Sequence, residues 1–255
     1  MRTKVLGLAF SPRQGNTEVL VQEALKSAEE LEVDTVFYSV AGKVINPCNA
    51  CYKCFASATS KKSCPSFTDA FDEILPCVME ADGVIIGSPV YYMGVTAQLK
   101  AFMDRSMSIE ALGYAWRNKV LGCIAIGYDR CGGQETAVKN IQNWGMMQDM
   151  ILVGLGPARP SRGIGGYTGV MAVQGFPHPV LSALPEALSA VKKDKIGMNA
   201  ARCLGKRVAE ISKVVKAGFQ LQKDEMWWPV GATKVEFAEK VKHLGRGGPR
   251  MGLKH

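Results

Sequence analysis

The sequence predicts an α/β fold in which a doubly wound, five-stranded parallel sheet carries helices on both faces. Short apolar segments alternate with amphipathic segments of helical period through the first 155 of the 255 residues, and this alternation is typical of parallel sheets. The segments at 83–87 and 119–126 are continuously apolar, as expected of strands buried on both faces. No apolar run approaches the ~18 residues that span a bilayer.

The elements follow in a regular order. Strands are predicted at 4–10, 34–40, 83–87, 119–126 and 151–155, with helices between them at about 17–31, 68–80, 96–106 and 135–149. Pro76 is expected to bend the second helix. After Gly156 the pattern stops. Residues 156–180 are rich in Gly and Pro and predict an irregular segment, followed by a short helix at 184–191 and an amphipathic helix at 200–217.

The first strand runs into a loop with the character of a phosphate site. In a parallel sheet, ligands bind at the carboxyl ends of the strands, and the free N–H groups of a helix N-terminus favour an anion there. Neither the Walker pattern nor G-x-G-x-x-G is present, and an ordinary capped turn remains the alternative. The loop offers hydroxyl and amide donors, a cation and a glycine: Ser11, Arg13, Gly15, Asn16 and Thr17.

Two further loops fall at the same predicted edge. The loop after the third strand offers tyrosines and a methionine that suit a flat aromatic ligand, with core packing as the alternative. The loop after the fourth strand has a pair of glycines whose N–H groups suit close approach of a ligand, with a Gly-rich turn as the alternative. Their candidate residues are Pro89, Val90, Tyr91, Tyr92, Met93 and Gly94, then Tyr128, Gly132 and Gly133.

Four of the eight cysteines lie in one loop at 46–65, where Cys48, Cys51 and Cys54 follow a C-x-x-C-x-x-C spacing and Cys64 follows after nine intervening residues. This density is typical of ligands to an iron–sulfur cubane. Zinc, which usually takes two separated pairs of ligands, and disulfide-bonded or free thiols are the alternatives. Cys77 is the alternative fourth ligand.

Three stretches occur in a characteristic order: Ser-Pro-Arg-x-Gly-Asn-Thr at 11–17, Gly-Ser-Pro-Val-Tyr at 87–91 with Leu-Lys-Ala-Phe-Met-Asp-Arg at 99–105, and Gly-Gly-Gln-Glu at 132–135. In this order they resemble the NAD(P)H-dependent FMN reductase group of flavodoxin-like proteins. The resemblance implies that the first loop binds the FMN phosphate and that 89–94 hold the ribityl chain and flavin ring. It also implies that Tyr128, Gly132 and Gly133 border the isoalloxazine.

Together with the cysteine motif, these stretches resemble the iron–sulfur flavoprotein family, in which a compact cysteine motif follows the second strand. The resemblance implies FMN, a [4Fe-4S] cluster and a homodimer or homotetramer. Lys100, Asp104 and Arg105 are then expected to fix helix and dimer geometry. Cys131 lies in the third loop, where it and Tyr128 are candidate neighbours of the flavin; no catalytic side chain is assigned, because the chemistry belongs to the flavin N5.

The function expected is that of an FMN-dependent oxidoreductase with a [4Fe-4S] cluster. It passes electrons between NAD(P)H or ferredoxin and a quinone, an oxygen species or a small organic substrate. One alternative is a non-catalytic electron carrier or redox sensor. Another is a cluster-free NAD(P)H-dependent FMN or quinone reductase. Hydrolase motifs are absent from the sequence, and only three histidines are available as bases.

The net charge of +8 is concentrated at the end of the chain, since residues 191–255 hold 15 of the 31 Lys and Arg but only 6 of the 23 Asp and Glu. We expect an FMN-binding core at 1–155, a segment at 156–217 that completes the domain, and a basic arm at 218–255 for oligomerisation. The charge then serves a subunit or partner contact, or a solvated helix face, rather than nucleic acid or a membrane. The N-terminus lacks signal-peptide features, which predicts a cytoplasmic location.

Overall fold

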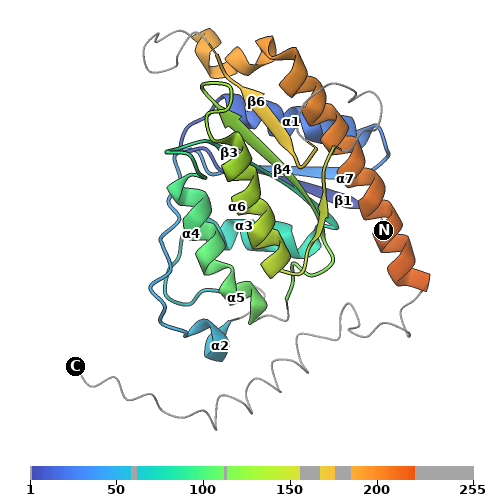
Figure 1. Cartoon of the computed structure of the whole chain (residues 1–255). Coiled ribbons are helices and arrows are strands. Elements are labelled where there is room, and N and C mark those ends of the chain that lie inside the picture. The colour runs from blue at the N-terminus through green and yellow to red at the C-terminus, as the bar shows by residue number, and fades with distance from the viewer. Residues whose placement is uncertain (1, 59–61, 112–113, 156–166, 176–184, 222–255) are drawn as a thin grey trace.

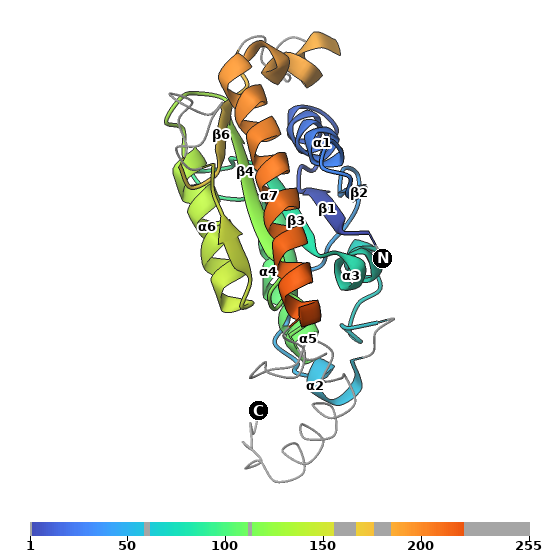
Figure 2. The same ribbon diagram turned by 90° about the vertical axis from the view of Figure 1, so that its right-hand side faces the viewer.

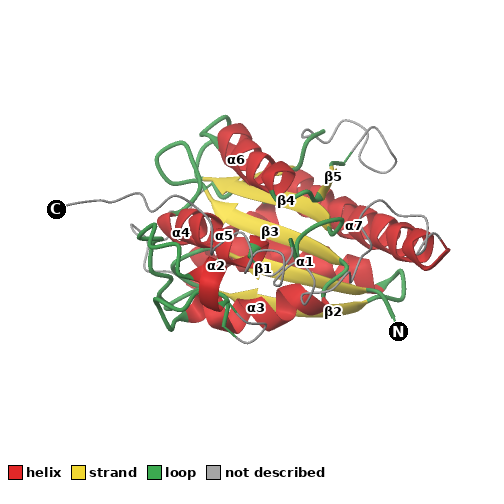
Figure 3. Cartoon of the chain, turned by 90° about the horizontal axis from the view of Figure 1, so that it is seen from below, coloured by secondary structure: helices red, strands yellow, loops and turns green. Residues whose placement is uncertain are grey.

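The computed structural model of the chain describes residues 2–58, 62–111, 114–155, 167–175 and 185–221. Its centre is a parallel sheet in the order β2-β1-β3-β4-β5 (Figure 1). The strands are β1 (Lys4–Ala9), β2 (Asp34–Ser39), β3 (Gly83–Pro89), β4 (Val120–Gly127) and β5 (Ile151–Val153). They run side by side across the view from below (Figure 3). This is the doubly wound order in which the ligand edge lies at the carboxyl ends of the strands, next to the point where the strand order reverses.

Helices cover both faces of the sheet (Figure 2). One face packs on α1 (Asn16–Glu29) and the long α7 (Lys195–Leu221), through side chains such as Leu20, Leu204 and Val208. The other packs on α3 (Ala70–Glu80), α4 (Ala97–Arg105) and α6 (Gln134–Met147). The predicted layers are therefore confirmed, and Pro76 lies inside α3 as expected.

The fifth strand position is shared by two short strands. β5 pairs with the first half of β4, whereas β6 (Val170–Val173) pairs with its second half. The sequence prediction placed residues 156–180 in an irregular segment, and for 170–173 this was wrong. Pairing with β4 sets these four residues in a strand although Gly and Pro surround them, because the long-range ladder satisfies their backbone groups.

The C-terminal helix is longer than predicted. The helix expected at 200–217 is α7, which continues to Leu221, so residues 218–221 of the predicted arm are helical; residues 222–255 lie outside the described part. The short helix expected at 184–191 is a 3-10 segment, η1 (Pro185–Lys193). The prediction did not include the one-turn helices α2 (Cys54–Ser57) and α5 (Met107–Glu110). None of the helices in the described ranges combines the length and apolar character that a bilayer span requires.

Candidate functional site

A cavity of about 130 Å³ lies at the carboxyl ends of β1, β3 and β4. The first and second predicted loops meet there, and the start of the third loop joins them. Nine predicted site residues line this cavity: Ser11, Arg13, Gly15, Asn16, Thr17, Pro89, Val90, Tyr91 and Tyr128. Five others are absent from its lining: Tyr92, Met93, Gly94, Gly132 and Gly133. The sheet therefore gathers most, but not all, of the predicted flavin residues in one place.

The first loop turns into α1 at a glycine that no other residue replaces without strain. Gly15 has φ +142°, and a Cβ built there would lie 3.1 Å from the carbonyl oxygen of Leu188 on η1. The Gly15 N–H donates to the carboxylate of Glu18 at 3.3 Å, which caps the helix. Ser11 closes the loop by donating its hydroxyl to the Arg13 carbonyl at 2.6 Å. The positive end of the α1 dipole thus faces a cavity that also contains Arg13.

The Asn16 side chain, which was predicted to be a donor to a bound phosphate, is hydrogen-bonded to η1 instead. Its side-chain amide donates to the Ala187 carbonyl at 2.9 Å, and its carbonyl oxygen accepts from the Val191 N–H at 2.9 Å. Both partners belong to η1, so the Asn16 side chain fastens η1 to the loop. This contact holds Leu188, another lining residue, against Gly15.

The second loop is a strained two-residue turn. Tyr91 and Gly94 exchange two backbone hydrogen bonds of 3.0 Å, and the two residues between them have φ of 46° at Tyr92 and 65° at Met93. A left-handed pair of non-glycine residues costs on the order of 1 kcal/mol each or more, and such strain clusters at ligand sites. The Tyr92 side chain is fully exposed, while Tyr91 contributes to the cavity.

The third loop packs on the second. Gly133 has φ +105°, and a Cβ there would lie 2.8 Å from the Met93 Cα. The Gly132 N–H donates to the side chain of Gln134 at 2.8 Å, so this donor is used within the loop. The Gln134 amide in turn donates to the Asp129 carbonyl at 2.7 Å. The two glycines therefore shape the contact between the loops, and of the three residues predicted here only Tyr128 lines the cavity.

Several lining residues were not predicted, namely Gln14, Ile126, Gly127, Gln174 and Leu188. Gln174 directly follows β6 and its backbone N–H donates to the Gly127 carbonyl at 2.8 Å. Its side-chain Nε2 is buried without a hydrogen-bond partner among the described residues. A buried donor of this kind calls for an acceptor, and a ligand carbonyl in this cavity would supply one.

The four motif cysteines line a second, smaller cavity of about 20 Å³. Cys48, Cys51, Cys54 and Cys64 all contribute to it, whereas Cys77 does not. The described residues contain no cluster of three or more His, Cys, Asp or Glu close enough to hold a single metal ion. The shared cavity nevertheless distinguishes Cys64 from Cys77 as the fourth member of the set.

The cysteine loop contains two non-glycine residues with left-handed backbone conformation. Ala50 and Tyr52 both have φ of 54°, and the Ala50 N–H donates to the Cys48 sulfur at 3.4 Å. The loop is tied to α5 because the Ser108 hydroxyl donates to that of Ser63 at 2.9 Å. The strained backbone is thus fastened to α5 beside Cys64.

The thiols differ in their surroundings. A side-chain hydrogen bond with Ser66, at 3.0 Å, and then a backbone hydrogen bond with Lys53 lower the pKa of the exposed Cys51 thiol. Burial raises the pKa of the Cys54 thiol. Cys51 is therefore the more easily deprotonated of these two thiols. This matters for metal binding, because the thiolate is the form that binds a metal.

A buried arginine lines the cysteine cavity as well. The Arg105 side chain is fully buried at the end of α4, and its Nη1 donates to both carboxylate oxygens of Asp69 at 2.7 and 2.6 Å. Burial raises the pKa of Asp69, but hydrogen bonds from Arg105 and Asn46 outweigh this and lower it. Nε and Nη2 of Arg105 have no hydrogen-bond partner in the described part of the chain. Arg105 was expected to fix helix geometry, and its place beside the cysteines was not predicted.

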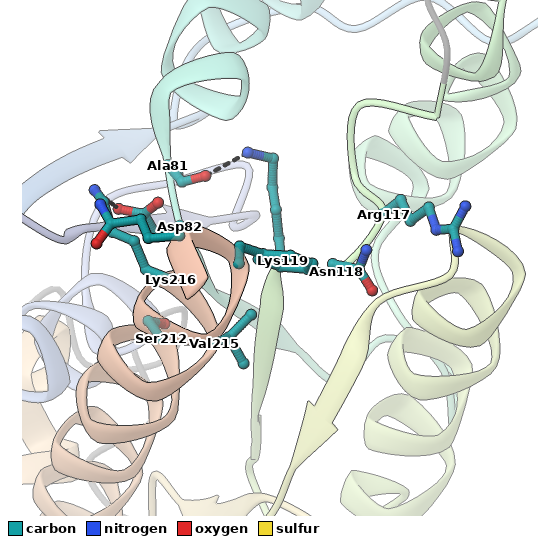
Figure 4. Close-up of a pocket in the computed structure, with 10 residues that line it drawn as sticks. Ala81, Asp82, Arg117, Asn118, Lys119, Ser212, Val215 and Lys216 are labelled. Carbon is teal, nitrogen blue, oxygen red and sulfur yellow. Dashed lines mark hydrogen bonds and ion pairs between the residues drawn. The ribbon is translucent and has the colours of Figure 1, made fainter. Parts of the chain in front are cut away.

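A further cavity, of about 340 Å³, lies at the opposite edge of the sheet, before β3 and β4 (Figure 4). None of the predicted site residues lines it. Its lysines have partners: Lys216 donates to Asp82 at 2.8 Å, and Lys119 donates to the Ala81 carbonyl. This cavity therefore adds nothing to the site at the carboxyl ends.

Lys119 makes the stability of the protein depend on pH. Burial lowers the pKa of its ammonium from 10.5 to about 8, so the folded state releases this proton before the unfolded chain does. Between pH 8 and 10.5 the unfolded chain holds more protons, and stability rises with pH. We expect the unfolding free energy of the native protein, minus that of Lys119→Met, to increase by about 2–3 kcal/mol from pH 7 to pH 10. Urea unfolding of both proteins at each pH measures this difference, and a constant difference would contradict the assignment.

Comparisons with known proteins identify the family of the chain. A family model described as NADPH-dependent FMN reductase matches residues 3–157. The chain belongs to this family. An iron-sulfur flavoprotein of Methanocaldococcus jannaschii is 44% identical over 214 residues, which cover 84% of this chain and 99% of that protein. An iron-sulfur flavoprotein of Archaeoglobus fulgidus is 34% identical over 208 residues, covering 81% and 96%.

These relatives place the chain among the iron–sulfur flavoproteins of the FMN reductase family, as the sequence motifs predicted. Among solved structures, a WrbA-like flavodoxin from Agrobacterium tumefaciens aligns with a TM-score of 0.53 at 17% identity, covering 83% of this chain and 98% of that one. This likeness confirms the flavodoxin-like fold.

Proposed function

We propose that the protein is an FMN-dependent oxidoreductase with a [4Fe-4S] cluster that passes electrons between NAD(P)H or ferredoxin and an acceptor. The acceptor would be a quinone, an oxygen species or a small organic molecule. The observation that carries the proposal is that four cysteines share one cavity with a buried arginine whose Nε and Nη2 lack partners among the described residues. The same chain has the larger first cavity at the N-terminus of α1.

The first cavity fits FMN. Arg13 and the α1 N-terminus would hold the phosphate. Because Gly15 has no side chain, the backbone at this position could approach the phosphate closely. Tyr91 and Tyr128 would border the ribityl chain and the ring. The unpartnered Gln174 Nε2 is available to a ring carbonyl. FMN held there would supply hydride exchange with a two-electron donor and one-electron release to an acceptor.

The donor groups of the second cavity, four thiols, are of the kind that an iron–sulfur cluster binds. Cys48, Cys51, Cys54 and Cys64 would be its ligands, and a thiolate-bound cluster carries negative charge that the Arg105 guanidinium complements. The names of the M. jannaschii and A. fulgidus relatives support this assignment. The cluster would supply one-electron transfer, and the role of the chain is to hold it and to set its potential.

We also propose that copies of the chain form a homodimer or homotetramer. Tyr92, Met93, Met146 and Met147 are exposed, and a neighbouring copy that covers them would remove apolar surface from water.

Anaerobic reduction tests the proposed activity. Purified holoprotein is mixed with NADPH or NADH, and the visible absorbance of the flavin is followed before and after addition of a quinone. We expect rapid bleaching and then turnover. Bleaching by reduced ferredoxin or dithionite alone, without turnover on the acceptor, would instead indicate an electron carrier. Bleaching by NAD(P)H in protein that lacks iron and sulfide would indicate a cluster-free reductase.

A further inference from the structure

We propose that the Nε and Nη2 groups of Arg105 donate hydrogen bonds to sulfur atoms of the cluster and thereby favour its reduced state. The inference rests on the proposed cluster and adds a residue outside the cysteine motif. A buried guanidinium whose N–H donors lack acceptors lowers the stability of the folded chain.

The burial of Arg105 is complete. Its side chain is 0% exposed and that of its partner Asp69 is 5% exposed. An unsatisfied buried donor costs about 1–3 kcal/mol, and more when it is charged. Nη1 is the nitrogen that binds Asp69, while Nε and Nη2 have no partner among the described residues. The folded chain would therefore carry a large cost unless an acceptor occupies this place.

The orientation of the guanidinium is fixed by its surroundings. Asp69 is itself held by the Asn46 side chain at 2.7 Å and by the Phe71 N–H at 3.0 Å, where it caps α3. The Phe71 ring lies under the guanidinium, 4.5 Å from Cζ, and the Phe67 ring lies 5.3 Å away. Arg105 is thus held at Nη1 and packed against two aromatic rings, and it lines the cavity together with the four cysteines. Nε and Nη2 are the donors that remain for a group bound in this cavity.

The chemistry of that cavity identifies the acceptor. The groups that line it alongside Arg105 include four thiols, and sulfur atoms of a thiolate-bound cluster accept N–H donors. Reduction adds one electron and no proton, so it increases the negative charge next to the guanidinium. Hydrogen bonds to charged acceptors are stronger, and the Arg105 donors therefore stabilise the reduced form more than the oxidised form.

The test compares Arg105→Lys with the native protein. Lysine keeps the charge for Asp69 but has no Nε or Nη2 donors. The matched control is Lys100→Gln, which removes an exposed charge from the same helix. All three proteins are purified anaerobically, assayed for iron and sulfide, and titrated with dithionite in the presence of redox mediators while the EPR signal of the reduced cluster is recorded.

At the native midpoint, we expect the ratio of reduced to oxidised cluster to fall about tenfold in Arg105→Lys, which corresponds to about 59 mV for one electron, and to change less than about twofold in Lys100→Gln. An unchanged ratio in Arg105→Lys would overturn the proposal. A native protein without iron and sulfide would instead refute the proposed cluster itself.

A second measurement uses the native sequence and does not depend on how a variant folds. Protein grown with ¹⁵N-arginine is reduced and examined by pulsed EPR. We expect a ¹⁵N coupling to the cluster that is absent from unlabelled protein. Absence of the coupling in cluster-containing protein would also overturn the role of Arg105.

Discussion

Cys64→Ser is expected to lose most of its iron and sulfide, whereas Cys77→Ser keeps both. Cys64 lines the cavity shared with the three C-x-x-C-x-x-C cysteines, while Cys77 lies in α3 with its sulfur 3.8 Å from the Glu73 carbonyl oxygen. A hard serine oxygen is a poor substitute for a thiolate at iron–sulfur clusters. Iron and sulfide analysis of both variants, purified anaerobically, measures the effect.

The Cys77 variant controls for the loss of any one cysteine from this part of the chain. The reverse pattern, with iron lost from Cys77→Ser and retained in Cys64→Ser, would show that the fourth ligand is assigned incorrectly. Both variants should keep FMN, because the two cavities share no lining residue.

Gly15→Ala is expected to weaken FMN binding about 10- to 100-fold, through a backbone strain of about 1–3 kcal/mol. Alanine at this position would have to adopt φ near +142°, and its Cβ would lie 3.1 Å from the Leu188 carbonyl oxygen. Either the loop or η1 would then have to move. Titration of the apoprotein with FMN, followed by flavin fluorescence, measures the change in affinity.

Gly42→Ala is the matched control. Gly42 also has positive φ, at +70°, but a Cβ there would meet no atom within 4 Å. We expect this variant to lose about 1 kcal/mol of stability and to bind FMN as the native protein does. Equal FMN affinity in Gly15→Ala and the native protein would argue against a phosphate site at this loop.

Local patterns were sufficient to predict most of the sheet. Continuous apolar runs bounded by glycine predicted β3 and β4, and helical spacing predicted α1. β6 was missed because its pairing with β4 is a long-range contact, and a four-residue strand within a Gly-rich segment has too little pattern of its own. The position of a short strand therefore depends on tertiary structure that periodicity does not encode.

In the candidate site, too, local sequence predicted some residues, while long-range contacts determined others. Loop chemistry next to strand ends predicted most of the first cavity, and cysteine spacing predicted the four cysteines of the second. The double hydrogen bond of Asn16 to η1, 171 residues away from it at Ala187, has no signal in the local sequence. Arg105 resembles an exposed charge at the end of an amphipathic helix, and its burial depends on Asp69, 36 residues earlier. Contacts of this range are set by the packed fold.

The most direct test of the account is the cofactor content of the native protein. Anaerobically purified chain is assayed for FMN, iron, acid-labile sulfide and zinc, and its absorption spectrum is recorded before and after reduction. We expect one FMN with about four iron and four sulfide per chain. Zinc without sulfide, or FMN with neither metal nor sulfide, would contradict it.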